Sequence, residues 1–438
     1  MIFHVASLGC ARNSVDSEIM AGRLLAAGHE QTSDPAEAGV IIVNTCSFIE
    51  AAINESIDTI LELAGYKKHG GCERIIVTGC LPERFREEIV TSLPEVDLFL
   101  GTGAYDRIVE AIDTQPKQVR CILPDPDALP GINDIQPRAV EPTPMAYVKI
   151  AEGCDRHCTY CIIPKLRGKQ KSRPIETIVQ EATKLIESGV KELVLVAQES
   201  SAYGRDLGLQ SGLSRLLAEL ATISTDIWIR VLYGHPASLD DAAIQTMHAA
   251  DNICPYFDIP IQHVSDRILK RMGRQYRQDD LLQLFDRIRS IVENACLRTT
   301  VIVGFPGETD ADFDILISGI EKIQFDHLGV FLYSDSADLV SHELSNHVSE
   351  KLAQNRYDAL MLRQRDISTQ NNRKYLHQTL PVLIEENPEA GLYIGRTVFQ
   401  APEVDGLTFV HADKLTIGQF ATVAITDTLD YDLTAEVS

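Results

Sequence analysis

Residues 151–161 of this 438-residue chain read AEGCDRHCTYC and place three cysteines on one short segment. Cys154, Cys158 and Cys161 follow the spacing C-x3-C-x2-C. Thiolates are the usual ligands of iron–sulfur clusters, so three of them can hold three irons of a four-iron, four-sulfur cluster. The fourth iron then lacks a protein ligand, and an open metal position is where a small molecule can bind and react. The alternative is a zinc knuckle, but zinc sites usually take four ligands in paired C-x2-C arrangements, and no fourth ligand lies nearby at such a spacing.

The region around this segment alternates strand and helix patterns. Helical patterns such as 175–188 and 279–295 separate the candidate strands, which are 146–150, 193–197, 227–232, 256–261, 297–303 and 327–333. Six strand–helix units with right-handed crossovers predict a partial or full TIM-like barrel. The cysteine segment follows the first of these strands, so we expect it at the carboxyl face of the barrel, where such folds keep their chemistry.

The first 120 residues also alternate strand and helix patterns. Apolar, β-branched runs at 2–6, 40–43 and 74–77 suit strands that are buried on both faces of a parallel sheet, and helical patterns at 14–27 and 50–64 lie between them. We therefore expect an open, doubly wound parallel α/β domain.

Each of these three runs leads to a cysteine, namely Cys10, Cys46 and Cys80. The carboxyl ends of parallel strands share one edge of a sheet, and ligands bind there. The three cysteines are therefore predicted to converge into a second three-thiolate site assembled from distant parts of the sequence. The alternative is three core cysteines, because free cysteine is often buried.

Two changes of pattern divide the rest of the chain. Residues 124–144 hold six of the 19 prolines with little periodicity, which is typical of an extended linker. A helical stretch at about 350–375 is followed from about residue 380 by short strand runs, which predict a small all-β module of the barrel type. We expect domains at 1–123, 145–370 and 371–438, with the linker at 124–144.

Composition narrows the class of protein. The hydrophobic content of 45% and the charged content of 24% are ordinary for a globular protein, and no apolar run reaches the length needed to span a bilayer. No signal peptide is recognised, so we expect a cytoplasmic protein whose ten cysteines stay reduced. The net charge of −23 argues against a broad nucleic-acid-binding surface and permits a basic protein as partner.

Taken together, these features resemble the methylthiotransferase family of radical S-adenosylmethionine (radical SAM) enzymes over nearly the whole chain. The resemblance implies an N-terminal methylthiotransferase domain, a radical SAM barrel and a C-terminal β-barrel of the TRAM type. It also implies two [4Fe-4S] clusters. Cys154, Cys158 and Cys161 match the cluster that binds SAM and splits it to a 5'-deoxyadenosyl radical, and Cys10, Cys46 and Cys80 match the auxiliary cluster, which carries the sulfur. SAM is expected to serve both as methyl donor and as radical source.

Within that family the chain is similar to the branch that modifies the β-carbon of an aspartate in small-subunit ribosomal protein twelve. Four strings carry this similarity: SLGCARN at 7–13, GCDR at 153–156, VAQESS at 196–201 and APEVDG at 401–406. In the branch that modifies an adenosine (isopentenyladenosine) of tRNA, Gln-Met-Asn is expected after the first cysteine. The C-terminal residues 371–438 have a net charge of −6, which suits a basic protein better than tRNA. The stretch YSDSADL at 333–339 departs from the Glu-Glu-Gly-Thr-like sequence common in the family, which puts the role of that loop in doubt.

Several other residues are candidates for binding SAM. By the resemblance, Tyr160 lies near the adenine, although core packing explains a buried aromatic equally well. Gln198 and Glu199 end the second barrel strand and could bind the amino group of SAM. Gly304, in the turn after the fifth strand, could approach SAM closely or simply form a tight turn. Arg167 and Arg173 could pair with a carboxylate of SAM or substrate, or lie on the solvated surface.

The remaining predictions concern residues and partners outside the two cysteine groups. His157 is interpreted as a loop residue and His263 as a residue behind the site, while Cys72, Cys121, Cys254 and Cys296 are expected to be structural or exposed thiols. No catalytic side chain is expected beyond the cluster ligands. The resemblance implies ribosomal protein twelve or the ribosomal subunit as partner, an electron donor such as flavodoxin, a sulfur donor and no membrane. Two alternatives stay open: the tRNA-modifying enzyme of the same family, and a non-catalytic iron–sulfur protein for electron transfer.

Overall fold

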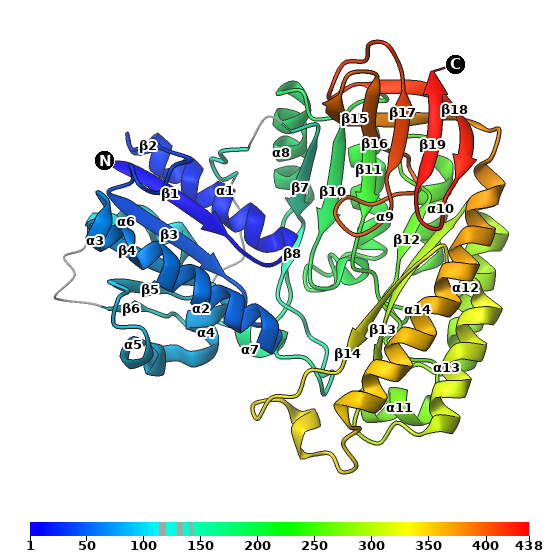
Figure 1. Ribbon diagram of the computed structural model, residues 1–438, viewed down its shortest axis with the longest axis horizontal. Coiled ribbons are helices and arrows are strands. Elements are labelled where there is room, and N and C mark those ends of the chain that lie inside the picture. The colour runs from blue at the N-terminus through cyan, green and yellow to red at the C-terminus, as the bar shows by residue number, and fades with distance from the viewer. Residues whose placement is uncertain (114–119, 129–134, 141–142, 438) are drawn as a thin grey trace.

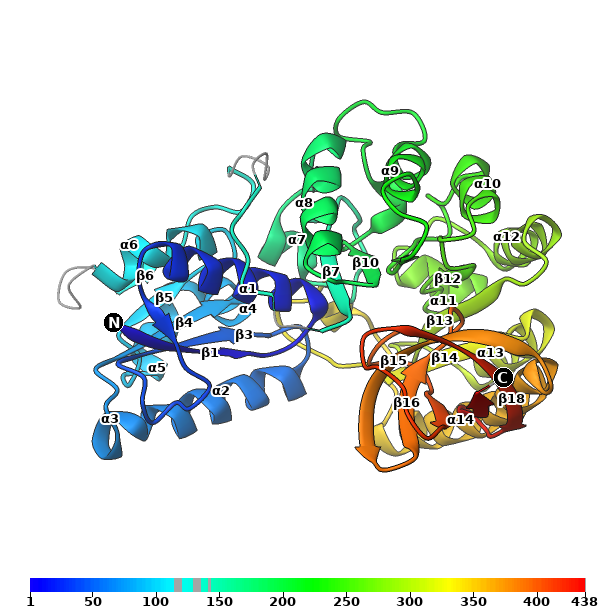
Figure 2. The same cartoon turned by 90° about the horizontal axis from the view of Figure 1, so that it is seen from above.

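Three parts follow one another along the chain: an α/β sheet, a curved wall of parallel strands and a small β-barrel (Figure 1). The computed structural model describes residues 1–113, 120–128, 135–140 and 143–437. The N-terminal part lies beside the curved wall, and the small barrel packs against the other end of the wall (Figures 1 and 2).

The N-terminal part is a six-stranded sheet with the order β2-β1-β3-β4-β5-β6, and all neighbours in it are parallel. Its strands are β1 (Ile2–Ser7), β2 (Glu30–Gln31), β3 (Val40–Thr45), β4 (Arg74–Gly79), β5 (Leu98–Leu100) and β6 (Cys121–Ile122). Its helices are α1 (Ala11–Ala26), α2 (Glu50–Ala64), α3 (Tyr66–His69), α4 (Cys80–Phe85), α5 (Ile89–Ser92) and α6 (Ile108–Asp113). Short 3-10 turns occupy η1 (Arg86–Glu88) and η2 (Tyr105–Arg107).

Strand β3 shows why this sheet needs helices on both faces. Val40 and Ile42 pack into a cluster with residues of α1 and α6, whereas Ile41 and Val43 pack into a second cluster with residues of α2 and α5. Side chains alternate between the faces of a strand, so a continuous apolar run is buried only when both faces are covered. Figure 2 shows α1 and α6 on one face of the sheet and α2 and α5 on the other. The expected doubly wound domain is confirmed.

The central part is an open, partial barrel. Two three-stranded parallel sheets, β7-β10-β11 and β12-β13-β14, are joined between β11 and β12 by a parallel bridge from Ile229 to Ile253. The strands are β7 (Met145–Lys149), β10 (Glu192–Val196), β11 (Trp228–Val231), β12 (Tyr256–Asp258), β13 (Cys296–Val303) and β14 (His327–Leu332). The fourth strand ends before the predicted 256–261 does, because Pro260 lacks the N–H group that a central strand needs.

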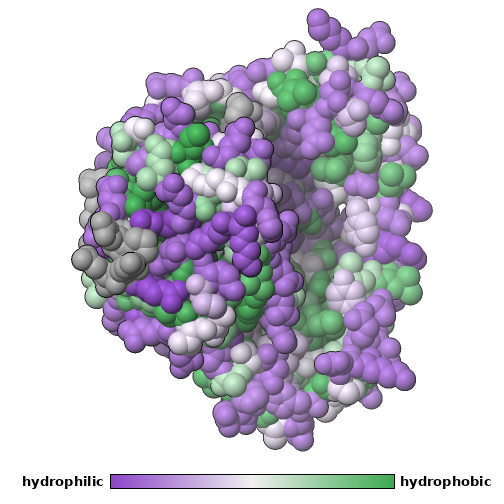
Figure 3. Space-filling model, turned by 60° about the vertical axis from the view of Figure 1, so that its left-hand side comes forward, coloured by the Kyte–Doolittle hydropathy of each residue, from purple (hydrophilic) through white to green (hydrophobic). Residues whose placement is uncertain are grey.

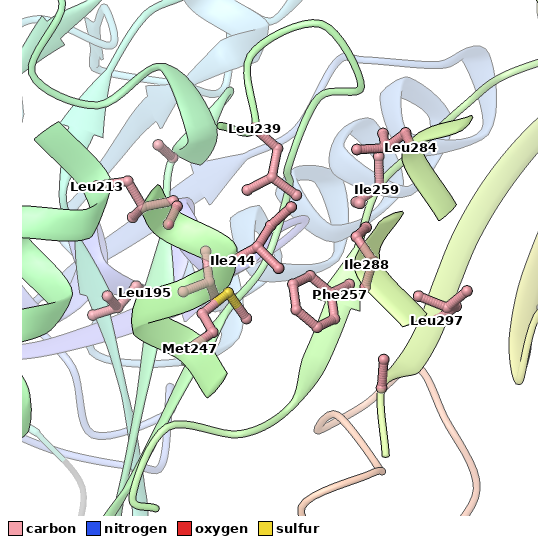
Figure 4. Packing of buried hydrophobic residues seen from close by; sticks show 14 of the residues in the cluster. Leu195, Leu213, Leu239, Ile244, Met247, Phe257, Ile259, Leu284, Ile288 and Leu297 are labelled. Atoms are coloured by element: carbon pink, nitrogen blue, oxygen red, sulfur yellow. The ribbon is translucent and has the colours of Figure 1, made fainter. Parts of the chain in front are cut away.

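Helices cover the outer face of this wall (Figures 1 and 2). They are α8 (Ile175–Glu187), α9 (Gly212–Ala221), α10 (Asp241–Ala249), α11 (Asp266–Arg271), α12 (Gln278–Ile291), α13 (Asp310–Ile323) and α14 (Glu350–Asn372). The 3-10 turns are η3 (Ser200–Ala202), η4 (Val340–Glu343) and η5 (Arg373–Tyr375). Figure 4 shows Leu213, Ile244, Met247 and Ile288 from these helices packing against Leu195 and Phe257 of the strands. This core fixes the strand ends that carry the site.

The C-terminal part is a closed five-stranded barrel with the order β15-β16-β17-β19-β18. Its strands are β15 (Thr379–Glu389), β16 (Leu392–Arg396), β17 (Thr408–His411), β18 (Phe420–Thr428) and β19 (Leu433–Val437). Buried ion pairs dock it on the central part: Glu192 of β10 binds Arg230 of β11 at 2.7 Å and Arg396 of β16 at 2.6 Å. The predicted small β-barrel is confirmed.

The segment between the first two parts lies partly outside the described residues, at 129–134 and 141–142. Its described residues form neither helix nor strand. Arg138 ties them to both neighbours through ion pairs with Glu18 of α1 and Glu181 of α8. Among the described residues, no helix is both long and apolar enough to cross a membrane.

Candidate functional site

Cys10, Cys46 and Cys80, which we call the N-terminal thiol group, lie at the carboxyl ends of three neighbouring strands. Cys10 precedes α1, Cys46 directly follows β3, and Cys80 is the first residue of α4. Strands β1, β3 and β4 are consecutive in the sheet, so the three thiols share one edge. The three strand ends share one edge of the sheet, and their assembly into a three-thiolate site stays a prediction.

The backbone around these thiols is held at close range. Gly9 has φ +95, and a Cβ atom there would lie 2.6 Å from the Cβ of Cys46, so only glycine fits between the two cysteines. Asn13 joins the first two strand ends, because its Nδ2 donates to the carbonyls of Leu8 at 2.9 Å and Thr45 at 3.0 Å. The loops are thus positioned by packing and hydrogen bonds of the chain itself.

The three thiols have different electrostatic surroundings. Burial alone would raise the pKa of Cys10, but Arg12 and Arg167 and two backbone N–H groups outweigh burial and hold this pKa below its ordinary value. Burial raises the pKa of Cys80 to about 11, although Arg167 opposes the shift. The guanidinium groups beside the thiols supply the positive charge that thiolate ligands of a metal cluster require.

Cys154, Cys158 and Cys161, which we call the barrel thiol group, lie on the loop after β7. The small hairpin of β8 (Ala151–Glu152) and β9 (Lys171–Ser172) opens this loop, and α7 (Ile163–Arg167) closes it. Gly153 has φ +81 and packs on the backbone of Lys169, while Thr159 donates its backbone N–H to the carbonyl of Met272 at 3.0 Å. The loop is therefore fixed on both sides. Burial raises the pKa of Cys161 to about 12, and the charges of Cys158 and Cys154 add to the shift.

The chemistry of the donor sets fits clusters better than single ions. Among the described residues, no three Cys, His, Asp or Glu side chains are gathered closely enough to hold one metal ion. Thiolates that bind a single zinc each lie about 2.3 Å from it and must converge. Thiolates of a four-iron cluster each bind a different iron and stay farther apart. Ligation of a cluster by each thiol group stays a prediction.

The carboxyl edge of the N-terminal sheet, which carries one thiol group, faces the carboxyl ends of the barrel strands, next to which the other thiol group lies. Arg167, on α7 behind the barrel thiol group, donates to Oδ1 of Asn13 at 2.5 Å and lies 3.6 Å from Sγ of Cys80. The same guanidinium pairs with Asp16 of α1 at 2.9 Å. Lys149, fully buried at the end of β7, pairs with Asp16 and with Glu152. A continuous network of buried charges therefore connects the two groups.

Figure 3 shows that the surface is hollowed between the N-terminal part and the rest of the molecule. A cavity of about 870 Å³ also lies at this junction, farther along α4. Arg84 of α4 lines it and pairs with Asp338 at 2.6 Å and with Ser336 at 2.7 Å. The loop at 333–339, whose sequence departs from the family pattern, thus binds the helix that begins with Cys80.

Gln198, a predicted SAM-binding residue, has one buried polar atom without a partner in the described part of the chain. It follows β10 by two residues, and its Nε2 donates to Glu152 at 2.5 Å. Its Oε1 is buried and has no hydrogen-bond partner among the described residues. A buried acceptor without a partner is costly, so this oxygen fits a ligand that donates an N–H, such as the amino group of SAM.

Glu199 is occupied by the protein itself. Arg156, two residues after Cys154, donates to both of its carboxylate oxygens at 2.7 Å, and Ser238 donates to the same carboxylate. Burial would raise the pKa of Glu199, but the hydrogen bond from Arg156, the positive charge nearby and the hydrogen bond from Ser238 hold it below its usual value. Glu199 therefore anchors the barrel loop, and its contact with the amino group of SAM stays a prediction.

Tyr160 and Gly304 both have structural partners. Tyr160 packs edge-on against Phe305, with ring centroids 6.4 Å apart. Gly304 has φ +77, and a Cβ atom there would lie 2.5 Å from the Cβ of Ala353 in α14. Core packing accounts for the first residue and helix packing for the second, and their contacts with SAM stay predictions.

The other candidates have the following surroundings. Arg173 is buried and binds Glu181 at 2.5 Å. His157 is exposed on its loop, as expected, whereas His263 is fully buried beside Asp312, and burial lowers its pKa to about 3. All ten cysteines lie in the described ranges and are free thiols. Of the four outside the two groups, Cys72, Cys254 and Cys296 are buried and Cys121 is half-buried.

Comparisons with known proteins agree with this architecture. Residues 2–101 match an uncharacterized protein family designated UPF0004, residues 148–318 match the radical SAM superfamily, and residues 378–437 match the TRAM domain. The chain is 54% identical to the ribosomal protein uS12 methylthiotransferase RimO of Desulfosudis oleivorans over all of both chains. The chain belongs to the radical SAM methylthiotransferase family.

Further relatives support the same assignment. Proteins with the same description are 48% identical in Clostridioides difficile, over 98% of this chain and 97% of that one, and 44% identical in Geobacter sulfurreducens, over 99% and 98%. Solved structures share the fold alone. The radical SAM methyltransferase TsrM of Kitasatospora setae has a TM-score of 0.60 at 13% identity and covers 84% of this chain and 89% of its own. As a radical SAM methylthiotransferase, the chain is an enzyme that uses an iron–sulfur cluster and SAM.

Two arginines of this radical SAM methylthiotransferase have contacts that the sequence does not predict. Arg12 was not a candidate, although it stands two residues after Cys10. Arg167 was expected near SAM or on the surface, yet it binds the N-terminal thiol group. The signal for Arg12 was its position beside a ligand cysteine. The position of Arg167 depends on how two distant domains pack, which a sequence pattern does not contain.

Proposed function

We propose that this enzyme inserts a methylthio group at the β-carbon of an aspartate in ribosomal protein uS12. The observation that carries the proposal is the pair of three-thiol groups on facing strand edges, together with the full-length identity to proteins described as acting on uS12. The domains of this enzyme are 1–123, 145–370 and 371–438, with 124–144 as linker.

The cysteines are the cluster ligands in this proposal. Two [4Fe-4S] clusters are held, one by Cys10, Cys46 and Cys80 and the other by Cys154, Cys158 and Cys161. When bound, the clusters and SAM supply the electron, the radical, the sulfur and the methyl group that the reaction needs. The chain holds the thiolates on loops fixed by Asn13, Gly9 and Gly153, and Oε1 of Gln198 accepts a hydrogen bond from the amino group of SAM.

The surroundings of the site serve to position and shield the reactants. An aliphatic C–H bond is too weakly acidic for any side chain to remove its proton, so the chain supplies binding, orientation and exclusion of water. Arg167, Asp16, Lys149 and Glu152 close the junction between the two edges with buried ion pairs. This network limits the access of water between the two thiol groups.

The charge of the enzyme supports a basic protein as partner. The exposed acidic residues of the C-terminal barrel outnumber its exposed basic residues; they are Glu386, Glu389, Glu403, Asp413, Asp427, Asp430 and Glu436, against Arg373, Lys374 and Lys414. Complementary charge favours the encounter with a basic ribosomal protein, free or in the ribosomal subunit, in the cytoplasm. An electron donor such as flavodoxin and a separate sulfur donor complete the system.

The test is a reaction under anaerobic conditions with reconstituted enzyme, SAM and dithionite. Purified uS12 and bulk tRNA are offered in separate reactions and analysed by mass spectrometry. We expect one methylthio group on an aspartate of uS12 and none on tRNA. A methylthio group on adenosine of tRNA, with uS12 unchanged, would assign the enzyme to the other branch, and SAM binding without cleavage would indicate a non-catalytic protein.

A further inference from the structure

Arg12 extends from the N-terminal thiol group to the edge of the barrel. Its Nη1 donates to the carbonyl of Ala197 at 2.8 Å, and its guanidinium lies 4.7 Å from the ring centroid of Tyr233. Ala197 directly follows β10 and Tyr233 follows β11 by two residues. The guanidinium of Arg12 therefore lies between the N-terminal thiol group and the carboxyl ends of β10 and β11.

The charge of Arg12 has no carboxylate partner. Among the described residues, no Asp or Glu lies within 4.0 Å of its guanidinium, whereas neighbouring Arg167 pairs with Asp16 and Arg156 pairs with Glu199. Only one of its five N–H donors has an acceptor within the described part of the chain, the carbonyl of Ala197. Arg12 is half-buried, and Glu152 acts on its charge only from beyond ion-pair distance, so the guanidinium keeps N–H donors that can bind an anion.

Two anions could supply that charge. The first is the nearby thiolate of Cys10, whose electrostatic interaction with Arg12 is favourable. The second is a ligand that enters between the two edges. The planar fork of guanidinium matches a carboxylate, with two parallel hydrogen bonds. Because the single bond to Ala197 leaves most of the fork free, the geometry favours a carboxylate ligand over a structural role.

We propose that Arg12 binds the side-chain carboxylate of the substrate aspartate. This inference rests on the proposed function and names the residue that selects the substrate within that site. The carbon to be modified is bonded directly to the carboxyl carbon, so fixing the carboxylate also fixes that carbon between the two thiol groups. Asparagine has the same shape without the charge, and the site discriminates against it.

The experiment measures binding of uS12 to full-length, anaerobically reconstituted, oxidised enzyme, so that no turnover occurs. Two forms of uS12 are compared, the natural protein and one with the target aspartate replaced by asparagine. Wild-type enzyme is expected to bind the aspartate form about tenfold to hundredfold more tightly, as for a charge-assisted pair. Arg12→Met should bind both forms equally, at the affinity of wild type for the asparagine form, and Arg12→Lys should retain part of the preference.

Controls separate recognition from effects on the fold or on the cluster. Arg287→Met in α12 should keep the wild-type preference, since Arg287 is exposed and its ion pair within the described residues is with Asp241. Iron content and melting temperature verify folding of each variant. If Arg12→Met keeps the preference for aspartate, the proposal is overturned. If Arg12→Met also shifts the potential of the auxiliary cluster while it keeps that preference, Arg12 is assigned to the cluster instead. Wild-type enzyme that neither binds nor modifies uS12 would overturn the proposed function and this inference together, whereas modification of uS12 without preference for aspartate would overturn this inference alone.

Discussion

At the scale of single residues, Arg167 joins the two halves of the site. It stands six residues after Cys161, yet its guanidinium contacts Asn13 and Cys80 of the other domain. A hydrogen-bond donor and a positive charge beside a cluster ligand both favour the more reduced, more negative state of the cluster. In the proposed function, Arg167 would therefore couple the packing of the domains to the electronic properties of the auxiliary cluster.

Replacing this arginine should change a potential that is measured without turnover. In a background where Cys154, Cys158 and Cys161 are replaced by alanine, Arg167→Gln should lower the midpoint potential of the remaining cluster by an amount on the order of 100 mV, from Coulomb's law at an effective dielectric of about 20. An EPR-monitored redox titration measures this change. Arg173→Gln serves as the control because Arg173 is a buried arginine of the same domain that pairs with Glu181. Equal potentials for all three proteins would contradict the role of Arg167.

His263 makes a second prediction at this scale. Burial holds its folded pKa at about 3, whereas an unfolded histidine titrates near pH 6.5, so below that pH the unfolded state binds the additional proton. The contribution of His263 to stability is therefore complete above about pH 6.5 and is lost, by about 1.4 kcal/mol per pH unit, as the pH falls toward 3. His263→Gln should weaken the fall of the melting temperature between pH 6.5 and 5, and exposed His248→Gln should leave it unchanged. Identical pH profiles for wild type and His263→Gln would refute this account.

At the scale of elements, the approach of α14 to the turn after β13 explains Gly304. Gly304→Ala should lower the melting temperature, because the added methyl group would lie 2.5 Å from the Cβ of Ala353 and φ is +77. Ala353→Gly in the same chain should restore the part of the stability that is due to the clash. SAM binding by the double variant separates two roles: normal affinity indicates helix packing alone, and lost affinity in a folded protein indicates contact with SAM.

Most elements followed from local pattern. The β-branched runs at 40–43 and 74–77 became β3 and β4, and the helical pattern at 175–188 became α8 almost unchanged. The fourth barrel strand was predicted too long, since a hydrophobic run at 256–261 hid the effect of Pro260 on the strand ladder. Among the site elements, the strand-end cysteines were predictable because parallel strands share their carboxyl edge.

The contacts between elements were less accessible to sequence reasoning. Glu199 stands at a strand end, as expected for a ligand-binding residue, but its partner Arg156 could be found only once the loop of the barrel thiol group was folded over it. The same holds for Arg12 and Tyr233, which lie 221 positions apart in the chain and meet through packing of two domains. Local pattern predicts elements and their ends, whereas ion pairs across domains depend on tertiary geometry.

At the scale of the whole molecule, a net charge of −23 should govern how the enzyme meets its substrate. The affinity for basic uS12 should fall steadily as the salt concentration rises, because complementary charges are screened. Bulk tRNA should show little binding even at low salt, since phosphates meet an acidic surface. Fluorescence anisotropy tests this expectation by measuring binding between about 50 and 500 mM salt. Over this range the Debye length falls from roughly 14 to 4 Å. Tight, salt-sensitive binding of tRNA would be incompatible with it.

The account depends most on two clusters held by two separate thiol groups that face each other. Iron and sulfide analysis with Mössbauer spectra, on wild type and on the two triple alanine variants, tests this claim most directly. We predict about eight irons per chain for wild type and about four for each variant, Cys10/Cys46/Cys80→Ala and Cys154/Cys158/Cys161→Ala, as two independent three-thiolate clusters require. About four irons in wild type, unchanged when Cys10, Cys46 and Cys80 are replaced, would contradict the second cluster and the mechanism built on it.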